Sequence, residues 1–265
     1  MFKNLLLAAV ILLCTLPCLG KKKEQPPDPA WAGITACGRM LAEYDFAAWH
    51  ATDAVFAAHA EKGHFNSYVA KRTNAGWVVV FGRLNDTRDK YFVAYKAVQG
   101  ATPEQFTISE NLPPQEDATF YPAARALEIS RGDFKGEKRP YNGAVLPAES
   151  NQMYVYIYPA QTQTGIYPLG GDVRYLISAD GSTIVEKRQL HKAILEIAYP
   201  NDPARKVVAG THNHVLSDVP EDTDVFYVLT RKPSIPEYIG AGKHVYKVQV
   251  DGTIVLEKWG PCFQI

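Results

Sequence analysis

The residues best suited to chemistry in this sequence are His212 and His214, which stand just after an apolar run. Residues 206–210 read Lys-Val-Val-Ala-Gly, a pattern typical of a β-strand, and Thr-His-Asn-His follows directly. Side chains two residues apart on an extended chain project from the same face, so the two imidazoles could bind one divalent ion. The pattern predicts a metal site, with two histidines that merely end an ordinary strand as the alternative.

A polar, acidic loop follows the two histidines and could supply a third ligand. Residues 217–224 read Ser-Asp-Val-Pro-Glu-Asp-Thr-Asp, and the apolar segment Val225 to Thr230 comes next, which we expect to be a strand. Zinc held by two histidines and one aspartate keeps one coordination position for water and lowers the pKa of that water toward neutrality. This donor set therefore indicates hydrolytic zinc chemistry.

The order strand, His-x-His, proline-containing loop, Asp and second strand resembles the JAB/MPN (JAMM) metallopeptidase pattern. The resemblance covers about 20 residues around His212 to Asp224. It implies a bound zinc ion with His212, His214 and Asp224 as its ligands. It also implies an upstream glutamate as catalytic general base, for which we select Glu186. Glu149 and Glu196 lie in a plausible interval as well.

The sequence departs from the family pattern in three respects. Val215 stands where proline usually follows the second histidine, Glu221 stands where the family has serine, and no upstream glutamate is singled out by its surroundings. Without the serine, the stabilisation of the transition state that the resemblance implies is missing. Without an identified glutamate, no base is assigned to take the proton of the zinc-bound water. A domain that keeps the fold and lacks the chemistry is therefore the alternative.

Two further groups of side chains could bind a ligand. Tyr154, Tyr156 and Tyr158 share one face of an expected strand, either as a stacking platform or, more commonly, as a sheet face buried under a helix. A basic group at another strand end could meet an anionic ligand or lipid, although a solvated edge that discourages strand pairing is the simpler interpretation. This basic group comprises Lys187, Arg188, His191 and Lys192.

The remaining sequence predicts an α+β fold, a mostly antiparallel sheet with N-terminal helices packed on it. Apolar residues at helical spacing from Trp31 to about Ala60 indicate two helices that break near Asp45, and another helix is expected over Thr119–Ile129. Alternating residues predict strands elsewhere, with Asp180-Gly181 and Asp251-Gly252 as hairpin turns. The expected strands include residues 77–81, 91–98, 106–108, 153–158, 173–178, 183–187, 245–250 and 253–257.

The first residues indicate export. The apolar run from Leu5 to Leu19 is shorter than the roughly 20 residues that span a bilayer, so residues 1–20 predict a signal peptide. Lys21 to Lys23 favour a retained anchor as the alternative. A lipid-anchored form through Cys14 or Cys18 fits less well, because neither cysteine follows a small residue.

Beyond the signal peptide we expect a linker over residues 21–30 and a single domain over residues 31–265, with no further transmembrane span. Cys37 and Cys262 remain after cleavage and could form a disulfide in an oxidising compartment or stay as buried thiols. Lys plus Arg equals Asp plus Glu, at 28 each in 265 residues, so no strong field argues for nucleic acid.

These expectations combine into two functional hypotheses for a periplasmic or secreted protein. The first is a zinc-dependent hydrolase that acts on an amide or isopeptide bond of a peptide or envelope component. The second is a non-catalytic exported domain that binds an envelope component.

Overall fold

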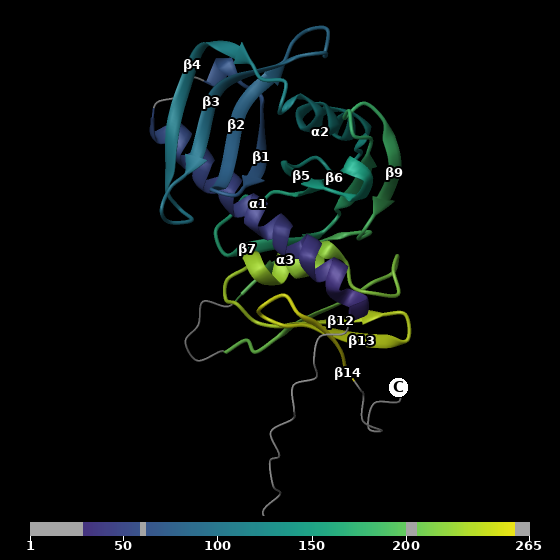
Figure 1. The fold of residues 1–265 in the computed structure, drawn as a ribbon. Helices are drawn as coiled ribbons and strands as arrows, with labels where there is room; N and C mark the ends of the chain where they lie inside the picture. Colours follow the sequence, from purple (N-terminus) through teal and green to yellow (C-terminus); the bar gives the residue numbers. More distant parts are fainter. Residues whose placement is uncertain (1–28, 59–61, 200–205, 258–265) are drawn as a thin grey trace, which may run out of the picture.

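The computed structural model describes residues 29–58, 62–199 and 206–257, which form three α-helices and 14 strands (Figure 1). The helices are α1 (Ala32–Ala57), α2 (Tyr121–Asp133) and α3 (Asp222–Thr230), and the 3-10 turns are η1 (Pro29–Trp31), η2 (Lys62–His64) and η3 (Glu149–Asn151). The strands of the N-terminal half are β1 (Ser67–Thr73), β2 (Gly76–Leu84), β3 (Tyr91–Gln99), β4 (Phe106–Glu116), β5 (Tyr141–Pro147) and β6 (Met153–Pro159). Those of the C-terminal half are β7 (Ile166–Gly170), β8 (Val173–Ile177), β9 (Ile184–Gln189), β10 (Ile194–Ala198), β11 (Gly210–Asn213), β12 (Glu237–Ala241), β13 (His244–Val248) and β14 (Ile254–Glu257).

The described strands form three four-stranded sheets and one two-stranded ribbon. The first sheet has the order β1-β2-β3-β4 and the second β5-β6-β8-β9, and all neighbours in both are antiparallel. The third sheet has the order β11-β12-β13-β14, in which β11 runs parallel to β12, and β7 pairs with β10 in the ribbon. The predicted α+β class with a mostly antiparallel sheet is confirmed.

One continuous helix, α1, stands where the sequence predicted two. Figure 1 shows it running from the third sheet past α3 to the first sheet. Its buried face is spaced at three to four residues and includes Leu41, Tyr44, Ala48, Ala51 and Val55. The predicted break near Asp45 is wrong, because no proline or glycine interrupts the helix there and the Asp45 carboxylate accepts a hydrogen bond from Tyr158 instead of capping a second helix.

Both faces of the second sheet are covered by helices. Tyr156 and Tyr158 are buried in one core cluster together with residues of α1, whereas Val155 and Ile157 are buried in a second cluster with residues of α2. Tyr154 packs against the first of these clusters. The tyrosine row is therefore a sheet face under a helix, as the more common interpretation of its pattern predicted.

The segment after the acidic loop is a helix, α3, and not the predicted strand. Val225 to Thr230 is rich in β-branched and aromatic residues, which favour strands by themselves. A capping box overrides this preference: the Glu221 side chain accepts the Asp224 backbone N–H, and the Asp224 side chain accepts the Glu221 backbone N–H. α1 and α3 are in close contact at Gly38, because a Cβ atom added to this glycine would lie only 2.5 Å from the backbone oxygen of Asp222.

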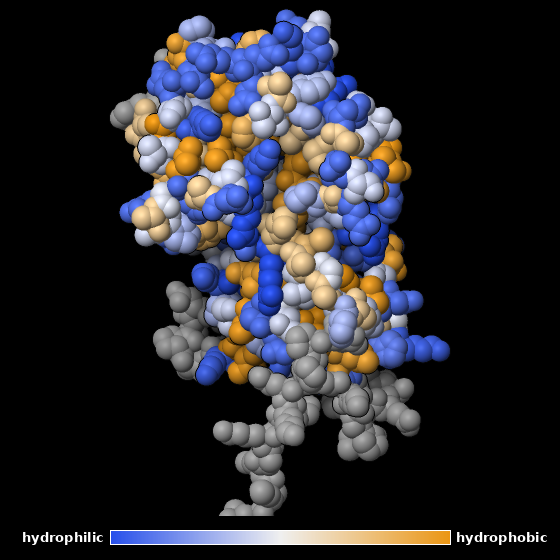
Figure 2. All heavy atoms as spheres, viewed as in Figure 1, coloured by the Kyte–Doolittle hydropathy of each residue, from blue (hydrophilic) through white to orange (hydrophobic). Residues whose placement is uncertain are grey.

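The two Asp-Gly hairpins are confirmed. Gly181 turns between β8 and β9 and Gly252 turns between β13 and β14, at φ angles of 79° and 83° that favour glycine. On the face shown in Figure 2, hydrophobic and hydrophilic residues are interspersed.

Several predictions fall on residues outside the described ranges. The signal peptide, residues 21–28 of the linker and Cys262 lie there, so the structure describes Cys37 in α1 but not its predicted partner. Among the described helices, none is long and apolar enough to cross a membrane.

Candidate metal centre

His212 lies in β11 and His214 directly follows the end of that strand, and the two approach each other closely. The strand predicted over residues 206–210 is wrong except at Gly210, where β11 begins, because residues 206–209 do not pair with another strand. β11 pairs in parallel with β12, and the alternation of this short strand leaves Thr211 and Asn213 exposed while His212 and His214 are buried. The Nε2 atoms of the two imidazoles lie 3.3 Å apart. The prediction that both imidazoles project from one face is confirmed.

Asp224 lies in the first turn of α3 and is fully buried. Its Oδ2 accepts the backbone N–H of Glu221 at 2.7 Å and lies 3.1 Å from His214 Nε2, while Oδ1 faces all three imidazoles of the group. Oδ1 is 2.9 Å from His212 Nε2 and 3.3 Å from His214 Nε2. The structure therefore brings together the three residues that the resemblance named as zinc ligands.

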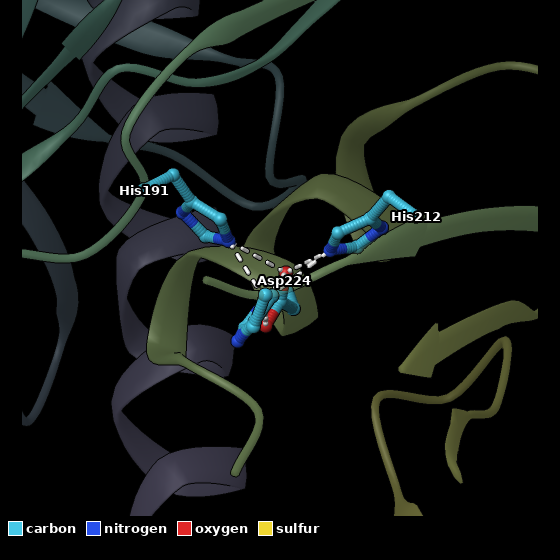
Figure 3. A group of neighbouring side chains, drawn as sticks. His191, His212 and Asp224 are labelled. Atoms are coloured by element: carbon cyan, nitrogen blue, oxygen red, sulfur yellow. Dashed lines mark hydrogen bonds and ion pairs between the residues drawn. The ribbon is translucent and has the colours of Figure 1, made fainter. Parts of the chain in front are cut away.

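A third histidine, His191, completes the group, although the sequence placed it in a basic strand end. It follows β9 by two residues and is 8% exposed, so it is not part of a solvated edge. Its Nε2 lies 3.0 Å from His214 Nε2 and 3.1 Å from Asp224 Oδ1. Figure 3 shows His191 and His212 pointing at Asp224 from opposite sides.

Each imidazole is oriented by an acceptor at its other ring nitrogen. His191 Nδ1 lies 2.8 Å from Asp172 Oδ1, His212 Nδ1 2.9 Å from Glu237 Oε1, and His214 Nδ1 3.0 Å from the carbonyl oxygen of Val219. An acceptor at Nδ1 requires the proton on that nitrogen, so in the neutral ring the Nε2 lone pair is free to bind a metal ion.

The four residues have the geometry of a metal site. One ligand atom from each of His191, His212, His214 and Asp224 lies within 4.8 Å of all the others. Five of the six separations between these atoms run from 2.9 to 3.3 Å, close to the edge of about 3.3 Å expected for a tetrahedron with zinc–ligand bonds near 2.0–2.1 Å. This buried group could hold a metal ion.

The charges of the group make a cation at its centre favourable. Burial by itself would lower the pKa of His212, but Asp224 and Glu237 raise it to about 9. Burial would likewise lower the pKa of His191, and Asp172 and Asp224 raise it well above its ordinary value. Burial would raise the pKa of Asp224, but the surrounding histidines hold it well below its usual range. In the absence of metal, protons therefore supply the positive charge.

We expect the metal-free protein to lose stability as the pH rises from about 6.5 to about 9. The pKa of folded His212 is about 9, above its ordinary 6.5, so its contribution is complete below pH 6.5 and is lost as the pH rises through the folded value. The loss amounts to at most roughly 3 kcal/mol for this residue. Urea unfolding in a chelator across this range measures it, and stability that stays flat or rises would contradict the account.

A buried ion pair between Arg231 and Glu237 lies next to His212. Glu237, which faces His212 through Oε1, also accepts Arg231 Nη1 at its Oε2 at 2.5 Å. Both side chains are completely buried, and Arg231 Nη2 donates to the Ile235 carbonyl at 2.6 Å. Arg231 thereby fixes the carboxylate that orients His212.

The glutamates proposed as general base lie elsewhere on the surface. Glu186 is exposed on β9 and is not one of the four grouped residues. Glu149 is exposed in η3, and Glu196 is exposed on β10, where it pairs with Arg139. The role predicted for Glu186 stays a prediction.

Two cavities of about 710 and 320 Å³ occur in the described part of the chain, and neither is lined by His191, His212, His214 or Asp224. Compared with known proteins, the chain matches no family model, no curated protein and no solved structure.

Proposed function

We propose that this is an exported zinc-binding protein in which one zinc ion, held by His191, His212, His214 and Asp224, joins parts of the fold. The observation that carries the proposal is the convergence of four ligand atoms from these residues, each within 4.8 Å of the others. Export rests on the signal-like run from Leu5 to Leu19.

The donor set supports zinc over other common divalent ions. Calcium and magnesium prefer ligand shells made of oxygen, whereas three imidazoles and one carboxylate suit zinc. Four buried ligands also match the preferred coordination number of zinc. Copper and nickel share the preference for imidazole, so a metal-content measurement that compares them with zinc is part of the test.

The ligands come from segments that are separate in the fold. His191 follows the last strand of the second sheet, His212 lies in β11 of the third sheet with His214 directly after it, and Asp224 belongs to α3. An ion held by all four residues cross-links these elements, and its binding free energy becomes folding free energy. This role needs neither a substrate pocket nor a general base.

The number of ligands supports a closed centre over a catalytic one. Structural zinc sites use four protein ligands, whereas catalytic sites use three and keep one position open. With His191 as fourth ligand, no position is left open. The ligands are also at most 9% exposed, which restricts the approach of a polymeric substrate.

A hydrolase is the second candidate, and a specific contact favours it. His191 Nδ1 lies 2.8 Å from Asp172 Oδ1, and a carboxylate-oriented imidazole is a typical general base. If His191 served as base, His212, His214 and Asp224 would hold zinc, as the resemblance to JAMM metallopeptidases implies. Zinc would then supply water activation toward an amide or isopeptide bond of an envelope peptide. His191 would take the role that the sequence gave to Glu186.

The variant His191→Ala separates the two candidates, with His244→Ala as control because His244 is exposed on β13. For a closed centre we expect about one equivalent of zinc in the parent and a loss of affinity of about 100-fold or more in His191→Ala, measured by chelator competition. His244→Ala should match the parent. Near-parent zinc affinity in His191→Ala, with loss of a peptidase activity present in the parent, would favour the hydrolase. Absence of zinc and other metals from the folded parent would reject both.

A further inference from the structure

A cavity of about 710 Å³ in the described part of the chain is a groove separate from the metal centre. α1 supplies one side with Asp45, Phe46 and Trp49, and residues of the first sheet, β6 and α3 also line it. This volume falls in the range of small-molecule sites. Nothing in the proposed zinc centre accounts for it.

Asp45 presents a partly satisfied carboxylate to this groove. Its Oδ1 accepts hydrogen bonds from Tyr158 Oη at 2.7 Å and from Asn142 Nδ2 at 3.5 Å. Among the described residues, Oδ2 has no hydrogen-bond donor or cationic partner, and burial raises the pKa of this carboxyl. Asp45 is half-buried, so its carboxylate is only partly hydrated, and a cation that reaches Oδ2 is stabilised there.

Aromatic rings surround the same space. Trp49, Trp77 and Phe226 line the groove together with Tyr158, whose ring centroid lies 5.0 Å from that of Phe226. Trp49 is 58% exposed, which is unusual for so large an apolar side chain in a groove. The negative faces of such rings attract organic cations.

The protein's own cations do not neutralise Asp45. Arg72 pairs with Glu43, and Arg39 pairs with Asp251, so these four rim charges cancel. Lys232 also lines the groove, but it is exposed, and water and salt screen its charge.

We propose that this groove binds a small organic ammonium ion, whose charged group pairs with Asp45 and whose apolar part packs on Trp49 and its aromatic neighbours. Packing on the apolar rings favours a ligand with an aryl or alkyl group, and the single free carboxylate oxygen of Asp45 can accept one ammonium group. This site is independent of the zinc proposal, since it shares no ligand residue with the metal centre.

The test uses three probes of matched size: phenethylammonium, the neutral 2-phenylethanol and the anionic phenylacetate. Binding to the zinc-loaded full chain is followed by calorimetry and by tryptophan fluorescence, because Trp49 and Trp77 line the groove. We expect saturable binding of phenethylammonium that is about tenfold or more tighter than that of either other probe.

Three variants locate the site. Asp45→Asn keeps the shape of the side chain and should weaken phenethylammonium about tenfold or more, and Trp49→Ala should weaken it without unfolding the protein, since Trp49 is exposed. Asp53→Asn removes the same charge from an exposed position of the same helix and should leave binding unchanged. Equal binding of all three probes, no binding of phenethylammonium, or full binding by folded Asp45→Asn would overturn the proposal.

Discussion

The variant Asp224→Asn is expected to lose its zinc, from about one equivalent to a trace, while the polypeptide remains able to form α3. The backbone N–H of Glu221 needs an acceptor at the Oδ2 position, so the amide oxygen of asparagine takes that place and the NH₂ group faces the imidazoles. An NH₂ group cannot bind a metal ion. At a free zinc concentration about 1,000 times the Kd of the parent, the free energy of unfolding of the variant should be about 4 kcal/mol lower than that of the parent.

Elemental analysis after gel filtration and urea unfolding with zinc measure the two effects. Asp218→Asn is the matched control, because Asp218 is an exposed aspartate of the same loop that does not belong to the metal group. It should retain zinc and parent stability. If Asp224→Asn kept a full equivalent of zinc, Asp224 would not be a ligand.

The second large effect is expected from Arg231→Met, which removes one partner of the buried Arg231–Glu237 pair. Both side chains are fully buried, so the variant leaves the Glu237 carboxylate without its counter-ion. Breaking such a pair costs about 3–5 kcal/mol. Because Glu237 also orients His212, zinc affinity should fall by about 10- to 100-fold.

Urea unfolding of the single and double variants tests this expectation. Adding Glu237→Gln to Arg231→Met removes the orphaned charge and should recover part of the lost stability, which a double-mutant cycle resolves. A loss below about 1 kcal/mol in Arg231→Met would mean that the pair is not buried as described.

Part of the centre could be predicted from the sequence because its residues are close in the chain. His212 lies in β11, His214 comes directly after that strand, and Asp224 follows in the next element. Local spacing and strand alternation therefore suffice to place the two imidazoles on one face. The Asp224 position followed from a pattern resemblance, and the structure brings it within 3.3 Å of both imidazoles.

His191 could not be found in the same way, because it lies in another sheet region and no spacing connects it to β11. Its neighbours Lys187, Arg188 and Lys192 suggested a basic surface, whereas the fold turns the imidazole alone inward. Asp172, which orients it, lies 19 residues earlier in the chain. Only the long-range pairing that follows from the fold brings these residues together.

Two of the errors in secondary structure have local causes. Val225 to Thr230 has the composition of a strand, and the capping box formed by Glu221 and Asp224 was the signal of a helix start that composition obscured. At Asp45, a polar residue in an apolar pattern suggested a helix boundary, but its partner Tyr158 comes from β6 and holds it inside α1. At α3 a contact between side chain and backbone outweighed the strand propensity of the residues. At Asp45 a contact with a distant element outweighed the local signal for a helix boundary.

X-ray absorption at the zinc edge of the purified, zinc-loaded protein tests the central claim most directly. The account predicts four ligands at about 2.0–2.1 Å, with scattering from three imidazoles and one carboxylate oxygen and no open position. Two imidazoles with additional oxygen ligands would contradict the closed centre and return His191 to the role of a base, and a protein that binds no zinc would contradict the metal centre itself.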